Sequence, residues 1–207
     1  MKTIAIPAHM HAQFPDLIDG MHRLRASVFK ERLEWDVEVV DGREVDDFDR
    51  LPATYILLLT GSSKVSGCAR LLPGSGVTML TGAFPQLLST GTLEAHAAMV
   101  ESSRFCVDTT IQEGRGAGAL HEATLTMLAG VIEWSIINGY SEIVTATDVR
   151  FERILKRAGW PMRRLGDPMR IGNTIAVAGS LPADRASLER VRPAGSRSIF
   201  NPLHKAA

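Results

Sequence analysis

The sequence lacks an excess of charge of either sign and has few cysteines. Its 207 residues carry 23 Lys and Arg against 23 Asp and Glu, which gives a formal net charge of zero. General nucleic-acid-binding proteins normally carry a basic excess, so this balance argues against that class of function. The two cysteines, Cys68 and Cys106, lie in apolar, strand-like runs. We therefore expect small buried thiols in a reducing compartment rather than a disulfide.

Long apolar segments are also missing. No run approaches the 18 or so apolar residues of a membrane-spanning helix, so we expect no membrane contact. The N-terminal stretch MKTIAIPAHMHAQFPD is interrupted by Pro7 and by histidines, unlike a secretory signal. We therefore expect a cytoplasmic protein. Length and composition, with 45% hydrophobic and 22% charged residues, predict a single domain over 1–207, with a loosely ordered tail from about 192 to 207.

No metal-binding pattern is recognisable. The acidic loop at 41–53 contains DGREVDDFD, which has neither the D-x-D-x-D-G spacing nor the distal glutamate of a calcium loop. The histidines are scattered, and neither His96 nor His121 has a partner at ligand spacing. We expect no bound metal and no catalytic role for these two histidines.

Hydrophobic periodicity and turn signals predict an α/β chain with one mixed sheet and helices on both faces. The expected strands are 3–6, 54–60, 65–73, 98–107, 142–147 and 174–181, the second and third forming a hairpin around GSSK. The expected helices are 15–33, 121–139 and 149–159, with a short helix near 84–88.

The stretch AMVESSRFCV, residues 97–106, places two charges inside a strand that otherwise reads as buried. Burying Glu101 and Arg104 costs several kcal/mol unless each is paired or hydrogen-bonded. Three residues apart on a regular strand, they point to opposite faces of the sheet. We therefore predict either a β-bulge near Ser102–Ser103 or two separate pockets, one served by each charge.

A glycine-rich segment, EGRGAG at 113–118, precedes the predicted helix at 121–139. Free N–H groups at a helix N-terminus favour an anion. Strand, glycine-rich turn and helix in this order resemble the core of GNAT-type N-acyltransferases, whose loop holds the pyrophosphate of coenzyme A. Glu113 stands where that pattern has Arg or Gln, and a carboxylate there would repel a pyrophosphate. A plain flexible turn explains the glycines equally well, so the segment supports the fold more than it supports coenzyme A binding.

A spaced set of residues carries a stronger resemblance. R-x3-F-x5-W, D-x2-D, R and E-x2-R occur in this order between 25 and 104, and Phe84 and ERILKRAGW at 152–160 extend the pattern. The combination closely resembles the acyl-homoserine-lactone synthases, the LuxI-type autoinducer synthases of bacterial quorum sensing. The resemblance implies a GNAT-like α/β/α sandwich with a mixed, mainly antiparallel sheet. A bulge in the 98–107 strand would splay it from 142–147 and open a slot for an acyl-pantetheine arm.

The resemblance also implies a reaction. The amine of S-adenosylmethionine attacks an acyl thioester, usually on acyl carrier protein, and the amide product closes to the lactone as methylthioadenosine leaves. S-adenosylmethionine is a substrate, and no metal or redox cofactor is needed. Three alternatives remain: the same reaction with an acyl-CoA donor, a GNAT-type acyltransferase acting on another amine, and a ligand-binding sensor that shares the fold.

Roles for individual residues follow from the resemblance. Glu101 is the expected base that deprotonates the amine, directly or through a water, and partial burial would raise its pKa towards a useful range. Backbone N–H groups on or beside its strand are expected to face the thioester carbonyl. The set expected to form the S-adenosylmethionine pocket is Arg25, Phe29, Trp35, Asp46, Asp49, Arg70, Arg104 and Phe105. Without the resemblance, its charged members read as a structural ion-pair network and its aromatic members as core.

The acyl chain is expected to lie among apolar residues of the long helix and the following strand. The candidates are Met79, Phe84, Leu125, Leu128, Val144, Thr145, Thr147 and Phe151. The apolar members are equally good core residues, and threonine also suits a strand. In this family a threonine here favours acyl chains oxygenated at carbon 3, and Thr147 best matches that position.

The predicted helix at 149–159 carries a basic stripe. Its members are Arg150, Arg153, Lys156 and Arg157, spaced on one helical face. A solvated helix surface explains the pattern, and so does a dock for acyl carrier protein, whose surface is strongly acidic.

Overall fold

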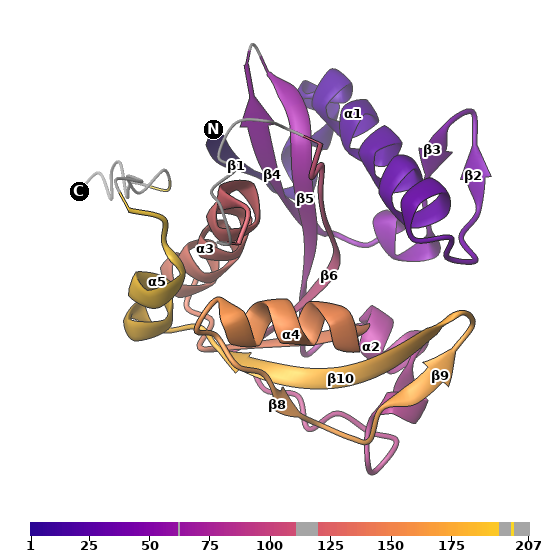
Figure 1. Cartoon of the computed structure of the whole chain (residues 1–207), viewed down its shortest axis with the longest axis vertical. Coiled ribbons are helices and arrows are strands. Elements are labelled where there is room, and N and C mark those ends of the chain that lie inside the picture. The colour runs from indigo at the N-terminus through magenta and orange to yellow at the C-terminus, as the bar shows by residue number, and fades with distance from the viewer. Residues whose placement is uncertain (62, 111–119, 195–199, 201–207) are drawn as a thin grey trace.

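The computed structural model describes residues 1–61, 63–110, 120–194 and 200, and its centre is one sheet of eight strands (Figure 1). The strand order is β1-β4-β5-β6-β7-β10-β8, with β9 also pairing with β10. Only β6 and β7 are parallel among the paired strands, which confirms a mixed, mainly antiparallel sheet. The bounds are β1 Lys2–Ile6, β4 Thr54–Thr60, β5 Lys64–Pro73, β6 Met99–Val107, β7 Glu142–Asp148, β8 Arg163–Arg164, β9 Met169–Ile171 and β10 Thr174–Pro182.

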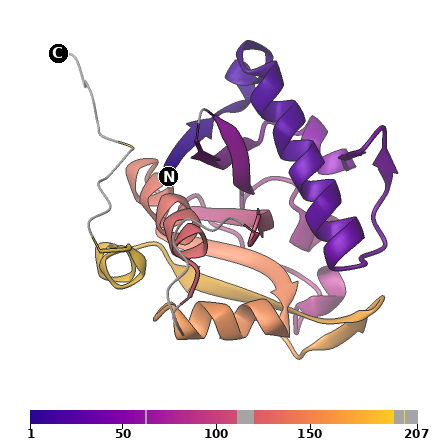
Figure 2. The same cartoon turned by 45° about the horizontal axis from the view of Figure 1, so that its top comes forward.

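Helices cover both faces of this sheet, as expected. In β4, Tyr55 and Leu57 pack in the cluster under the first helix, whereas Ile56 and Leu58 pack in the cluster under α3. Figure 2 shows α1, in indigo, and α3, in salmon, on opposite sides of these strands. The helices are α1 Pro15–Arg25, α2 Met79–Gly82, α3 Glu122–Ile137, α4 Val149–Arg157 and α5 Arg185–Val191.

The first helix changes geometry before it ends. α1 is followed directly by η2, a π-helical segment at Ala26–Arg32, so the single helix predicted at 15–33 is present with two hydrogen-bonding patterns. π-Helical turns occur frequently at functional sites. Here the change lies around Phe29, one of the expected pocket residues.

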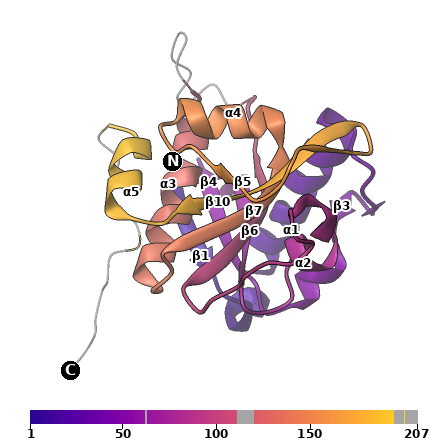
Figure 3. The ribbon, with the colours of Figure 1, turned by 90° about the horizontal axis from the view of Figure 1, so that it is seen from below.

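β6 and β7 pair for only three rungs and then diverge. The ladder joins Met99 to Glu142, Val100 to Ile143, and Glu101 to Val144. β6 continues to Val107 and β7 to Asp148 without further pairing between them. Figure 3 shows β7 between β6 and β10 from below. The predicted splay between these two strands is confirmed.

The predicted bulge is also present, slightly further along β6. Between the register pairs Arg70–Ser103 and Cys68–Cys106, β5 advances two residues while β6 advances three. The extra residue lies at Arg104–Phe105 rather than at Ser102–Ser103. Arg104 has a φ of 53°, a left-handed conformation that costs a non-glycine residue about 1–3 kcal/mol.

Several short elements carry no clear sequence signal. They are the hairpin of β2 Val39–Val40 and β3 Arg43–Glu44, the 3-10 segments η1 Ala8–Gln13, η3 Asp47–Arg50 and η4 Pro85–Leu87, and the strands β8 and β9. Strands of two or three residues are too short to show a period, and β8 and β9 exist because β10 pairs with them. The segment predicted as a short helix at 84–88 contains η4, with α2 just before it. α5, which was not predicted, begins after Asp184, whose side chain accepts a hydrogen bond from the Ser187 N–H.

The remaining expectations concern the cysteines, the glycine-rich segment, the C-terminal tail and membrane contact. Cys68 and Cys106 are buried free thiols, as expected, and face each other across β5 and β6 with 3.4 Å between their sulfur atoms. The glycine-rich segment at 113–118 and most of the tail from 192 lie outside the described residues. None of the helices described is long and apolar enough to cross a membrane.

Candidate active site

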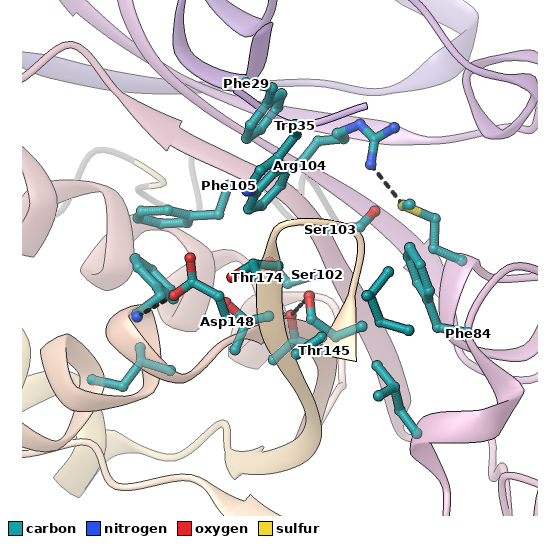
Figure 4. A pocket seen from close by; sticks show the side chains of 18 of the residues that line it. Phe29, Trp35, Phe84, Ser102, Ser103, Arg104, Phe105, Thr145, Asp148 and Thr174 are labelled. Atoms are coloured by element: carbon teal, nitrogen blue, oxygen red, sulfur yellow. Dashed lines mark hydrogen bonds between the residues drawn. The ribbon is translucent and has the colours of Figure 1, made fainter. Parts of the chain in front are cut away.

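A cavity of about 370 Å³ lies where β6 and β7 diverge (Figure 4). Side chains from all three hydrophobic clusters of the chain reach its wall. One side is formed by η2 and the segment after it, another by α3 and α4, and a third by α2 and η4. Residues of β6, β7 and β10 and the turn between β9 and β10 form the rest of the wall. The cavity therefore lies between the two strands that diverge, β6 and β7.

Two stacked aromatic rings and one guanidinium form the first part of the wall. Phe29 and Trp35 lie with 5.1 Å between ring centroids and an interplanar angle of 5°. The guanidinium of Arg104 lies 5.6 Å from the centroid of the Phe29 ring. Figure 4 shows the three side chains together on the N-terminal side of the cavity. All three were predicted for the S-adenosylmethionine pocket.

Behind this wall lies a buried network of three arginines and three carboxylates. Arg25 pairs with Glu44 through its Nε at 2.5 Å and with both oxygens of Asp49 at 2.8 and 2.9 Å. Arg25 and Glu44 are 0% and 1% exposed. Since opposite charges are equal in number, the burial leaves no side-chain charge of the network uncompensated.

The other two arginines extend the network to the central strands. Arg70 contacts Asp46 at 2.5 Å and Asp49 at 2.7 Å. Arg104 contacts Glu44 at 2.9 Å and Asp46 at 2.8 Å. The structure therefore brings together all the charged residues predicted for the S-adenosylmethionine pocket, but only Arg104 among them lines the cavity.

Glu44 is a member of the network that sequence reasoning missed. It is one of several acidic residues around the polar loop at 41–53, and no spacing singles it out. Its burial results from the β2–β3 hairpin, which places it beside Arg25 and Arg104.

Titration of the network follows from these contacts. Burial alone would raise the pKa of Asp49, but the hydrogen bonds and charge of Arg25, with the charge of Arg70, hold it well below its usual range. Burial and the neighbouring Asp49 raise the pKa of Tyr55, whose hydroxyl donates to Asp49 at 2.7 Å. Both carboxylate and phenol therefore keep fixed protonation states around neutral pH.

Glu101 lies beside the cavity and does not line it. Its side chain is buried, and its two oxygens accept hydrogen bonds from the N–H groups of Met79 and Leu80, at 2.9 and 2.6 Å. These are the first residues of α2. Burial raises the pKa of Glu101, although the two N–H groups act in the opposite direction. The next residues of β6, Ser102 and Ser103, do line the cavity.

The acyl-pocket candidates divide into two groups. Those that line the cavity are Met79, Phe84, Leu128, Thr145, Thr147 and Phe151. The structure does not place Leu125 or Val144 in its wall. Val144 pairs with Glu101 in the last rung of the β6–β7 ladder, and its side chain packs in the cluster with Leu80 and Met99. Leu125 is half-buried and packs against the core around α3.

Phe105 was predicted to share a pocket with Phe29 and Trp35, but it lies on a different side of the cavity from them. Its ring packs against Phe151 with 4.8 Å between centroids, in the cluster under α3 and α4. The bulge explains this position, because Arg104 and Phe105 are consecutive and serve opposite parts of the site. Further lining residues that the sequence did not single out include Asp148, Trp160 and Asn173.

The basic stripe on α4 is exposed. Arg150, Arg153, Lys156 and Arg157 all face solvent, whereas Leu155 on the same helix is buried. In the described part of the chain none of the four forms an ion pair within 4 Å, and the nearby Glu152 is engaged by Arg164 at 2.7 Å. The stripe therefore presents uncompensated positive charge.

No group of three or more His, Cys, Asp or Glu within the described ranges is arranged to hold a metal ion. The carboxylates of Glu44, Asp46 and Asp49 lie close together, but arginine side chains pair with them. That the reaction needs no cofactor stays a prediction.

Replacing Asp49 by Asn is expected to lower the free energy of unfolding by about 3–5 kcal/mol at pH 7, because Arg25 and Arg70 lose a buried counter-charge. The folded-state pKa of Asp49 is depressed, so its contribution is complete above the unfolded value of about 4 and disappears as the pH falls through the folded value. Urea unfolding between pH 7 and pH 2.5 measures both effects.

The matched control is Asp19→Asn, which removes a carboxylate from the exposed pairs with Arg23 and Arg43. It is expected to cost less than about 1 kcal/mol. Equal losses for the two variants would show that the network contributes no more than a surface ion pair.

The chain resembles known proteins in sequence and in structure. The sequence profile of the family described as autoinducer synthase matches residues 10–191. The acyl-homoserine-lactone synthase of Rhizobium radiobacter is 65% identical over 212 residues and covers 100% of both chains.

Two solved structures superimpose on most of the chain. The acyl-homoserine-lactone synthase LasI gives a TM-score of 0.78 at 30% identity, over 95% of this chain and 99% of its own. The CoA-dependent acyl-homoserine lactone synthase BjaI, solved with SAM and isopentyl-CoA, gives a TM-score of 0.80 at 25% identity, over 94% of each chain. From its sequence, its GNAT-like fold and its site, the chain belongs to the autoinducer synthase family, the acyl-homoserine-lactone synthases.

Proposed function

We propose that this acyltransferase moves an acyl group from acyl carrier protein to the amine of S-adenosylmethionine, and that the product closes to the lactone with release of methylthioadenosine. The observation that supports this most directly is the cavity at the β6–β7 splay. It joins an aromatic and cationic wall, suited to a nucleoside and an amino acid, to a largely apolar chamber suited to an acyl chain. The BjaI structure, solved with SAM and isopentyl-CoA, supports the same pairing of substrates.

The nucleotide side is the wall formed by Phe29, Trp35 and Arg104. An aromatic face attracts a cation such as the sulfonium and stacks with adenine. Arg104 is the network arginine that reaches the cavity, and it is 11% exposed. It binds the substrate carboxylate, while the remaining network fixes its position from behind.

Proton removal from the amine is assigned to Glu101, acting through a water. Its carboxylate is buried and held by α2, so it does not itself reach the cavity surface. Its raised pKa makes it a better base than an ordinary glutamate. A water beside Ser102 or Ser103 would connect it to the amine.

The acyl thioester lies in the slot between β6 and β7. The ladder ends at Glu101, so backbone groups of β6 beyond this point have no partner in β7. N–H groups on this edge stabilise the oxyanion of the tetrahedral intermediate. Thr145 and Thr147 line the apolar side and offer hydroxyls to an acyl chain oxygenated at carbon 3.

Acyl carrier protein is the proposed donor because of the exposed stripe on α4. Four exposed cations on the helix that carries Phe151 would steer an acidic partner. The alternative donor is acyl-CoA, which the BjaI relative uses. The cytoplasmic location also stays a prediction.

Incubation of the protein with S-adenosylmethionine and a panel of acyl carrier protein and CoA thioesters tests the reaction. We expect N-acyl-homoserine lactone and methylthioadenosine in equal amounts, identified by mass spectrometry, with acyl carrier protein thioesters as the better donors. Absence of both products with every donor would exclude the proposed reaction.

Glu101→Gln is expected to reduce kcat at least 100-fold, because general-base catalysis typically contributes about 10²–10⁴-fold. In the unsubstituted protein kcat/KM should fall as the pH drops through the raised pKa of Glu101, since the base must be deprotonated. Glu189→Gln, which changes an exposed carboxylate on α5, is the control. Wild-type turnover by Glu101→Gln, or the same loss in Glu189→Gln, would remove Glu101 as the base.

The double variant Arg153→Glu/Lys156→Glu is expected to raise the KM for an acyl carrier protein thioester at least tenfold at low salt, and to leave the KM for the matching acyl-CoA unchanged. Since the attraction is electrostatic, the difference should shrink above about 0.5 M salt. Steady-state kinetics with both donors measure it. Arg185→Glu, an exposed reversal on α5, is the control. An equal change for both donors would argue against docking on α4.

A further inference from the structure

The turn between β9 and β10 bridges the cavity to the N-terminal part of the chain. Gly172 and Asn173 form a two-residue turn between the paired residues Ile171 and Thr174, and Gly172 supplies the positive φ of 56° that such turns require. Both turn residues and Thr174 line the cavity. Figure 1 shows the hairpin extending from the main body of the sheet.

Asn173 makes a specific contact across this gap. Its side-chain Nδ2 donates to the carbonyl oxygens of Leu33 and Glu34, at 3.3 and 2.8 Å. The partners are 140 and 139 positions away in the sequence. One amide group therefore ties the last hairpin of the sheet to the segment that follows η2.

The segment that Asn173 holds is irregular and strained. Glu34 has a φ of 54°, which costs a non-glycine residue about 1–3 kcal/mol unless its surroundings impose it. The next residue is Trp35, whose N–H donates to the Phe29 carbonyl at 2.8 Å. Hydrogen bonds therefore hold the backbone at 33–35 from two directions, from η2 and from Asn173. Trp35 is the last residue of this segment.

We propose that Asn173 is a positioning residue of the nucleotide subsite, acting through Trp35. By fixing the carbonyls of Leu33 and Glu34, it sets the Trp35 ring parallel to Phe29 and thereby the aromatic face offered to the substrate nucleoside. An amide suits this role because it offers two N–H donors to two carbonyls. An aspartate of the same shape has no donor and would repel both oxygens. This inference rests on the proposed binding of S-adenosylmethionine.

A different reading gives Asn173 only the role of a turn residue that stabilises its own hairpin. The effect of Asn173 on Trp35 distinguishes the two roles. A turn residue affects the stability of the hairpin, whereas a positioning residue also changes the environment of Trp35 and the affinity for the nucleotide substrate, without changing the acyl side of the cavity.

Fluorine NMR of protein labelled with 5-fluorotryptophan tests the contact directly. The chain has three tryptophans, at 35, 134 and 160, so three resonances are expected, and Trp35→Phe assigns the first. Asn173→Ala and Asn173→Asp should shift or broaden the Trp35 resonance only. Asn138→Ala is the matched control, because Asn138 is an exposed asparagine whose Nδ2 donates to the Trp134 carbonyl at 2.8 Å. It should affect the Trp134 resonance only.

Calorimetric titration with S-adenosylmethionine then tests the consequence. Asn173→Ala should raise the dissociation constant about fivefold to tenfold, the equivalent of roughly one net hydrogen bond, and Asn173→Asp should raise it further. The KM for the acyl thioester should not change. Asn138→Ala should bind as the unsubstituted protein does.

Three results would overturn the inference. They are an unchanged Trp35 resonance in both Asn173 variants, an unchanged dissociation constant, and an equal loss of affinity in Asn138→Ala. If the unsubstituted protein fails to bind S-adenosylmethionine, the proposed function fails instead, and the fluorine spectra still decide whether Asn173 positions Trp35.

Discussion

The buried network of Arg25, Arg70 and Arg104 with three carboxylates is the interaction on which the rest of the site depends. It joins α1, the loop at 41–53, β5 and β6, which are four separate stretches of sequence. Arginines are suited to it because each guanidinium binds carboxylates through several N–H groups in a fixed plane. Removing any carboxylate leaves a buried cation, so the members are mutually dependent. The network can therefore hold Arg104 in a strained conformation at the cavity wall.

The end of the β6–β7 ladder has a comparable effect on the other half of the site. Beyond Glu101 the two strands separate, and three hydrophobic clusters meet around the gap. Glu101 itself is directed to the N-terminus of α2, where it fixes the helix that carries Met79. The same carboxylate thus stabilises one wall of the cavity and lies one residue from the slot. The bulge at Arg104–Phe105 then sends consecutive side chains to different parts of the cavity wall, Arg104 towards Phe29 and Phe105 towards Phe151.

Sequence reasoning succeeded where a pattern was long or where a buried charge required an explanation. The long apolar helix that became α3 and the continuous apolar run of β4 both lie close to their predicted bounds. The charges in β6 predicted either a bulge near Ser102–Ser103 or two pockets, and a bulge exists slightly further along, at Arg104–Phe105. β8 and β9 were missed because two- and three-residue strands form only on an existing partner. Val144 was placed in the cavity wall because the sequence does not show that its side chain packs in the cluster with Leu80 and Met99.

Residue type and order were enough to predict the family, the mixed sheet and most of the charged residues in the network. Which of these residues reach the cavity depends on the tertiary fold. Glu44 and Asn173 illustrate the difference: each acts on a residue far away in the chain, through a contact that a turn creates. The physical reason is that the role of a side chain depends on the groups that it contacts across the fold. Local periodicity contains no information about those distant partners.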